Sequence, residues 1–248
     1  MHMMYMLLIL SVVFLAAMFL MCLFRDRLNN PVINPLFLIA SAIFFFCWTY
    51  ATYERNGLEN GFMTLDNISP LICTIIPVTP LLNKKVKDFV YCAISFLSLG
   101  MFVAMLVSPG ADYFMHFQQN AKFHHVSEGA CHLIMGLYGY YLILSGKVEI
   151  SFKSLAKGAA FIYASVFFGV FLNWCFHLGH FGMDMYGNYS IYFIDIFGSF
   201  EATFVAYLVG ILGTVILGFL SAIFIDWVAT PKIKEAPIPN RTDVEETI

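Results

Sequence analysis

The sequence has few charged residues. They make up 12% of its 248 residues, about half of the roughly 25% typical of soluble globular chains. The 13 Lys and Arg side chains and the 16 Asp and Glu side chains are similar in number. Most basic residues lie in short clusters between apolar runs, so there is no broad basic face and nucleic-acid binding is excluded. Hydrophobic residues reach 60% and the mean hydropathy is +0.79, which predicts an integral membrane protein.

The sequence also lacks paired cysteines. None of its six cysteines forms a Cys-x-x-Cys pair, and each lies inside an apolar run, which argues against a disulfide framework or a zinc knuckle. We expect Cys22, Cys47, Cys92, Cys131 and Cys175 to be small buried hydrophobes. Cys73 stands apart as a candidate nucleophile.

Aromatic residues are abundant, at 17% of the chain. We expect most of them to face lipid or to form an interfacial belt, as with Trp48, Tyr50 and Tyr53 near the end of an apolar run.

Long apolar runs dominate the chain. A helix needs about 20 apolar residues to cross a bilayer, and six runs reach about that length: Tyr5–Phe24, Val32–Tyr53, Phe89–Val107, His125–Leu144, Leu155–Leu178 and Ser199–Ile225. A seventh, Ile68–Leu82, is shorter and contains three prolines, so it is either a short broken span or a re-entrant segment. The sequence predicts an all-α polytopic membrane bundle over residues 1–227, followed by a polar cytoplasmic tail, 228–248, that we expect to be disordered.

Basic residues near span ends tend to stay in the cytoplasm. If Ile68–Leu82 crosses and the N-terminus is outside, 11 Lys and Arg residues are cytoplasmic and only Arg55 and Lys122 are outside. If the segment does not cross and the N-terminus is inside, Arg25, Arg27 and Lys122 are outside, and the tally is 10 against 3. Charge alone does not separate the two topologies, although both place the C-terminus in the cytoplasm.

Polar residues inside spans are costly and by default mark a site that faces the bundle interior. In the seven-span topology His125, Glu128 and His132 share one face of the fifth span because of their i, i+3, i+7 spacing. Asn173 and His177 share a face of the sixth span. We expect Cys73, His132 and Asn173 to lie at similar depths. His180 and Glu201 follow at the same membrane side.

Pro77 gives a local reason to single out Cys73. A proline four residues later cannot donate a hydrogen bond to the Cys73 carbonyl, so the backbone there should be distorted or capped by another group. Irregular backbone at membrane depth is tolerated where it lines a cavity. This pattern favours a pocket wall over a lipid-facing surface.

Two chemistries fit these residues. Cys73, His132 and Asn173 could form a Cys-His-Asn arrangement for acyl transfer, in which the imidazole takes the thiol proton and a thioester forms. Alternatively, the imidazoles and carboxylate could hold zinc or iron: His125, Glu128, His132, His177 and His180. The same polar groups could also serve only as helix-packing contacts or as tips at the membrane interface.

Several stretches resemble the YwaF-type integral membrane family, which includes the eukaryotic transmembrane protein 164 acyltransferases. From Asn83 onward they cover about half the chain: Asn83-Lys84-Lys85 before Phe89-Val90-Tyr91, Leu106-Val107-Ser108-Pro109, His132-Leu133-Ile134-Met135-Gly136-Leu137 before Tyr141-Leu142, Phe152-Lys153-Ser154-Leu155, Leu172-Asn173-Trp174 and Gly187-Asn188-Tyr189. The run Ile68-Ser69-Pro70-Leu71-Ile72-Cys73 is similar to the family's cysteine-bearing third span, with Leu71 where the family has a histidine.

The resemblance implies seven spans, with Cys73 and His132 at the positions of the acyl-accepting cysteine and its histidine. We therefore expect an acyltransferase or transacylase that acts on glycerolipids in an outer-leaflet cavity, with membrane lipids as its partners and no cofactor or metal. Asn173 would orient the imidazole or bind the substrate carbonyl, and Glu128, His125 and His177 would lie near the head group. The alternatives are a non-enzymatic lipid-binding or transport subunit of a membrane complex and a metal-dependent membrane enzyme.

Overall fold

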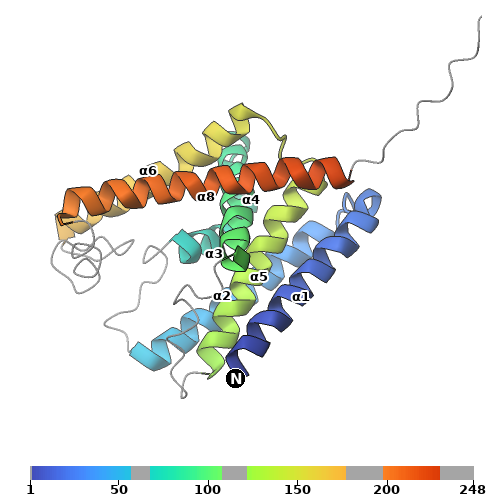
Figure 1. The fold of residues 1–248 in the computed structure, drawn as a ribbon, viewed down its shortest axis with the longest axis horizontal. Coiled ribbons are helices and arrows are strands. Elements are labelled where there is room, and N and C mark those ends of the chain that lie inside the picture. The colour runs from blue at the N-terminus through green and yellow to red at the C-terminus, as the bar shows by residue number, and fades with distance from the viewer. Residues whose placement is uncertain (1, 57–67, 108–121, 177–197, 230–248) are drawn as a thin grey trace, which may run out of the picture.

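The structure is a computed structural model that describes residues 2–56, 68–107, 122–176 and 198–229. Every regular element in these ranges is helical (Figure 1). The α-helices are α1 (His2–Leu23), α2 (Ile33–Asn56), α3 (Ile68–Val78), α4 (Lys84–Val107), α5 (Lys122–Leu144), α6 (Phe152–Phe176) and α8 (Phe200–Ala229). Two 3-10 turns, η1 (Arg25–Arg27) and η4 (Thr79–Leu81), follow α1 and α3.

The predicted all-α fold class is confirmed for the described residues, and each apolar run of the sequence coincides with a helix. The largest difference in bounds is at α4, which begins at Lys84 and not at Phe89, because hydropathy marks the apolar part of a helix and not its charged first turns. Among the residues that the structure describes, four helices are long and apolar enough to span a membrane: Ile33–Glu54, Lys84–Val103, Phe152–Phe176 and Phe200–Ala229. The predicted tail lies almost entirely outside the described residues.

Helix α4 is the centre of the bundle. Helices α5, α6 and α8 pack on it, and every residue from 92 to 100 is buried. Each of these three helices presents a glycine to α4. A Cβ at Gly139 of α5 would lie 3.1 Å from the Ile94 carbonyl oxygen, and one at Gly158 of α6 would lie 3.1 Å from the Cys92 carbonyl. Small residues let the backbones approach closely, which is how membrane helices gain packing contacts.

The crossing of α4 and α8 is the closest of these contacts. A Cβ at Gly218 would collide with the Phe96 carbonyl oxygen, and a Cβ at Gly100 would collide with the Thr214 carbonyl oxygen. The contact is thus reciprocal, since each helix supplies one glycine and one facing carbonyl. Only residues without a side chain permit this approach.

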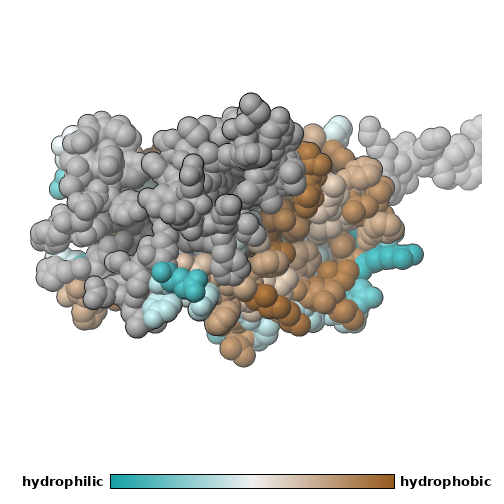
Figure 2. Space-filling view, turned by 90° about the horizontal axis from the view of Figure 1, so that it is seen from below, coloured by the Kyte–Doolittle hydropathy of each residue, from teal (hydrophilic) through white to brown (hydrophobic). Residues whose placement is uncertain are grey.

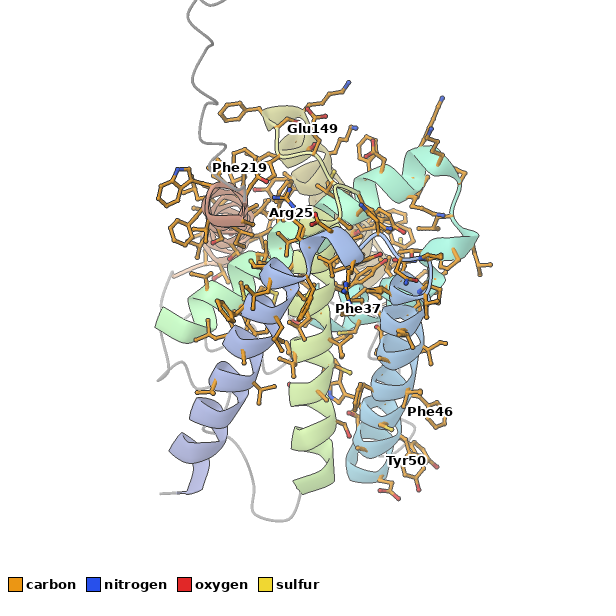
Figure 3. All side chains as sticks on the ribbon, turned by 90° about the vertical axis from the view of Figure 1, so that its right-hand side faces the viewer. Arg25, Phe37, Phe46, Tyr50, Glu149 and Phe219 are labelled. Atoms are coloured by element: carbon orange, nitrogen blue, oxygen red, sulfur yellow. The ribbon has the colours of Figure 1, made fainter. Side chains whose placement is uncertain are left out.

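Helices α1, α5 and α2 run side by side, with α5 in the middle, in Figure 3. Helix α3 packs against α2, α5 and α4, and seven of its residues are buried. The short, proline-containing segment of the sequence is therefore an internal element, surrounded by longer helices.

The outer surface of the described helices is largely apolar. Figure 2 shows hydrophobic residues gathered over much of the described part of one face. Large exposed side chains include Phe46 of α2, Trp174 of α6 and Val209 of α8, with exposed fractions of 71%, 71% and 63%. Exposed apolar area on this scale is typical of a surface that faces lipid.

Within the described part of the chain, two ion pairs connect helix ends. Arg25, just after α1, pairs with Asp226 near the end of α8 at an N–O distance of 3.3 Å. Lys157 in the second turn of α6 pairs with Asp88 in the second turn of α4. The end of α1 therefore meets the end of α8, and the start of α4 meets the start of α6.

Candidate functional site

Cys73 is buried where α3 packs on α5. Its side chain is 1% exposed, and its thiol donates to the carbonyl oxygen of Cys131, with the sulfur 3.9 Å from the oxygen. The structure thus brings Cys73 beside Cys131, the residue that precedes His132 on α5, and the predicted similarity in depth stays a prediction.

The predicted capping of the Cys73 backbone is confirmed. Pro77 lies within α3 and has no N–H to donate to the Cys73 carbonyl. The hydroxyl of Ser41, buried on α2, donates to that carbonyl at 3.5 Å. A side chain from a neighbouring helix therefore occupies the place of the missing helical hydrogen bond and ties α3 to α2.

The imidazole of His132 is fixed by its own helix. It is 8% exposed, and Nδ1 lies 2.8 Å from the Glu128 carbonyl oxygen. Because a carbonyl can only accept, Nδ1 carries the proton in this hydrogen bond. In the neutral ring Nε2 is then the basic nitrogen, which is the tautomer a general base needs if it acts through Nε2.

Trp48 of α2 lies against the imidazole, with ring centroids 5.6 Å apart. The interpretation of Trp48 as a lipid-facing or belt residue is wrong, because its side chain is only 3% exposed. Tyr50 and Tyr53 are exposed, as predicted. Trp48 is buried because α2 turns that face towards α5, and its Nε1–H has no hydrogen-bond partner among the described residues.

The remaining cysteines differ in their surroundings. Cys92 and Cys131 are buried, as predicted, whereas Cys22 and Cys47 are half-buried. Cys175 is exposed, between the exposed side chains of Trp174 and Phe176 on α6. A small hydrophobic side chain loses nothing by facing lipid, so burial was the wrong prediction there.

Asn173 is buried on α6, the helix that packs on α4 and α8. It has interaction partners in the structure, and an orienting role towards His132 stays a prediction. The side chain of Glu128 is half-buried, while its carbonyl holds the imidazole. Glu201 is exposed in the first turn of α8.

The structure describes none of the side chains of three predicted histidines. His177 and His180 are outside the described residues, and at His125 only the helical backbone is described. Among the described side chains there is no group of three or more His, Cys, Asp or Glu residues that could hold a metal ion. The metal hypothesis depends on the histidines outside this set, so it stays a prediction.

Sequence reasoning missed Ser41 and Trp48. They are seven residues apart on α2, two helical turns, and therefore lie on one face of the helix. Ser41 meets α3 through Cys73, and Trp48 meets α5 through His132. The sequence did offer one signal for these two residues, a serine two turns before a tryptophan on the same face of an apolar helix. This signal becomes informative only when the partner helices are known.

Comparisons with known protein families, with curated proteins and with solved structures give no match for this chain.

Proposed function

We propose that the chain is a membrane acyltransferase or transacylase that transfers acyl groups between glycerolipids through Cys73 and His132. The observation that carries the proposal is the contact of the Cys73 thiol with the turn of α5 that holds His132. The fixed ring of His132, with its proton on Nδ1, supports a role for Nε2 as general base. The family resemblance points to the same two residues.

The proposed reaction has two steps, acylation of Cys73 and transfer of the acyl group to the acceptor. The thiol proton of Cys73 passes to Nε2 of His132, and the sulfur attacks the ester carbonyl of a phospholipid. The lysophospholipid alkoxide leaves with the proton from His132, and a thioester remains. The hydroxyl of a second glycerolipid then gives its proton to His132 and attacks the thioester, and the Cys73 thiolate departs and recovers the proton.

Trp48 supplies the hydrogen-bond donor for the tetrahedral intermediate in this proposal. Its indole N–H is buried beside His132, and a buried donor without a protein partner is costly unless a ligand uses it. A donor aimed at the developing oxyanion stabilises the charge of the transition state. The positioning role assigned from the sequence stays with Asn173. The head-group role stays with Glu128, His125 and His177.

Seven membrane crossings with an outside N-terminus are part of the proposal. In addition to the four long apolar helices, α1, α3 and α5 also cross the membrane. The Arg25–Asp226 and Lys157–Asp88 ion pairs support this topology, because it places the ends of α1 and α8 and the starts of α4 and α6 on the cytoplasmic side. Integral membrane localisation follows from the same helices.

Proteoliposomes test the activity. They contain a phosphatidylcholine with an isotope-labelled acyl chain and an unlabelled lysophospholipid acceptor, and mass spectrometry follows the label. Cys73→Ser should abolish transfer, because a serine hydroxyl is a far weaker nucleophile here than a thiolate. Cys92→Ser, at an equally buried thiol of α4, should transfer normally. Full transfer by Cys73→Ser would contradict the proposal.

A second candidate function is a non-enzymatic lipid-binding or transport subunit. The burial of Cys73, at 1% exposed, favours it, because an ester carbonyl must reach the sulfur for acyl transfer. The same proteoliposomes separate the two functions. Movement of intact labelled lipid between vesicles, without label appearing in the acceptor, would support the second one.

A further inference from the structure

An apolar groove lies between α1, α4 and α8, on a different part of the molecule from Cys73 and His132. Its volume is about 500 Å³, within the range of roughly 300–1,000 Å³ that small-molecule sites occupy. Its walls include Met18, Leu99, Phe102, Val103, Leu220 and Phe224.

The groove opens on the lipid-facing surface. Leu15 and Phe224, which line it from α1 and α8, are 51% and 63% exposed. Leu99 of α4 is 1% exposed and forms the floor. A chain in the surrounding lipid could therefore enter sideways between α1 and α8.

The few polar groups of the groove already have partners. The Sγ of Cys22 lies 2.7 Å from the hydroxyl oxygen of Tyr140, and the Ser221 hydroxyl donates to the Leu217 carbonyl oxygen at 2.7 Å. The walls thus offer an occupant apolar contacts only. Hydrocarbon fits such a surface, whereas a polar ligand would lose its hydrogen bonds with water.

The Arg25–Asp226 ion pair stands at one end of the groove. Arg25 follows the wall residue Cys22 by three residues, and its partner Asp226 lies between the wall residues Ile225 and Val228. Figure 3 labels Arg25 at the end of α1. Its side chain is 31% exposed and donates one hydrogen bond to Asp226. A guanidinium has five N–H donors in a planar fork that suits phosphate, so donors remain for an anionic group.

We propose that this groove binds one glycerophospholipid, with an acyl chain along Leu99 and Val103 and the phosphate on Arg25. The apolar walls match the chain, and the guanidinium matches the phosphate in charge and geometry. Arg27 is exposed in η1, and the carboxylate of Asp26 lies between the two arginines. The site is separate from the acyl-transfer site and does not rest on the proposed function.

Photo-crosslinking of the full chain in nanodiscs tests the site. The probe is a phosphatidylcholine with a diazirine near the middle of one acyl chain, and mass spectrometry identifies the labelled peptides. We expect label on the α4 peptide that contains Leu99 and Val103. Leu220→Trp should fill the groove from its exposed rim and reduce that label about tenfold, whereas Val209→Trp, on the exposed side of the same helix outside the groove, should leave it unchanged.

Arg25→Gln tests the phosphate contact. It should reduce the label at α4 several-fold, while a melting measurement checks that the variant is folded. The proposal fails if the α4 peptide is labelled equally in Leu220→Trp and Val209→Trp, or if label is spread evenly over all lipid-facing helices. Either result would mean that the groove holds only bulk lipid. A diazirine fatty acid that labels α4 equally well and is not displaced by phosphatidylcholine would assign the groove to a fatty acid. Crosslinks between two copies of the chain at α1 and α8 would assign it to a second copy. Either result would overturn the proposal.

Discussion

The hydroxyl of Ser41 on α2 donates to the carbonyl of Cys73 on α3, with the two oxygens 3.5 Å apart. This carbonyl receives no hydrogen bond from residue i+4, because Pro77 has no N–H. Ser41 therefore stabilises the backbone of the candidate nucleophile from another helix. Cys73 therefore contacts α2 through its carbonyl and α5 through its thiol.

Loss of the Ser41 hydroxyl should destabilise the protein measurably. Ser41→Ala leaves the Cys73 carbonyl unsatisfied in a dry environment, which should cost about 1–3 kcal/mol. Thermal unfolding in detergent measures the effect. The matched control is Ser165→Ala, which removes a hydroxyl that donates to the Phe161 carbonyl of its own helix. Equal melting temperatures for the two variants would show that the Ser41 link contributes nothing.

The reciprocal glycine contact between α4 and α8 should tolerate no added methyl group. Gly218→Ala places a Cβ against the Phe96 carbonyl oxygen, and overpacking of this kind costs about 1–3 kcal/mol or more. Gly213→Ala on the same helix meets no atom within 4 Å and should be neutral or slightly stabilising, because alanine favours helix over glycine. Similar unfolding of both variants would contradict the packing of α4 on α8.

Trp48 should matter for acyl transfer more than for folding. Trp48→Phe keeps an aromatic ring beside His132 and removes the indole N–H. If that N–H stabilises the oxyanion, kcat should fall by roughly 10²–10³, with little change in melting temperature. Trp174→Phe, the same substitution on the exposed face of α6, serves as control. An unchanged kcat for Trp48→Phe would remove Trp48 from the mechanism.

The helices could be predicted from the sequence because a bilayer imposes a length on apolar segments. The predicted runs and the observed helices coincide, including the short segment Ile68–Leu82, which forms α3 and η4. A distorted or capped backbone at Cys73 was also predictable, since it follows from the covalent structure of Pro77 alone. Both predictions rest on physics local to one segment.

The contacts between segments could not be predicted in the same way. Apolar runs face lipid or protein with the same residue types, so nothing in α2 alone identifies Trp48 as buried against His132. The identity of the capping group, Ser41, depends on which helix packs beside α3. Likewise, the reciprocal contact of Gly100 and Gly218 follows from the crossing of α4 and α8, and each glycine by itself is unremarkable in a membrane helix.

The seven-span topology makes a prediction for single cysteines placed on either side of Ile68–Leu82. In a background without reactive cysteines, Asn60→Cys should react with an impermeant thiol reagent from outside and Lys85→Cys only from the cytoplasmic side. The two positions are then separated by roughly 30 Å of hydrocarbon. Labelling of both from one side would mean that Ile68–Leu82 does not cross, and it would remove the seven-span proposal.

The acyl-enzyme itself gives the most direct test of the proposed mechanism. The purified protein is incubated with a labelled phospholipid without acceptor, quenched in acid, digested and examined by mass spectrometry. The mechanism predicts one acyl group on the peptide that contains Cys73, bound as a hydroxylamine-sensitive thioester and absent after His132→Gln. A protein that transfers acyl chains to added acceptor, yet shows no acyl group on Cys73 under these conditions, would contradict it.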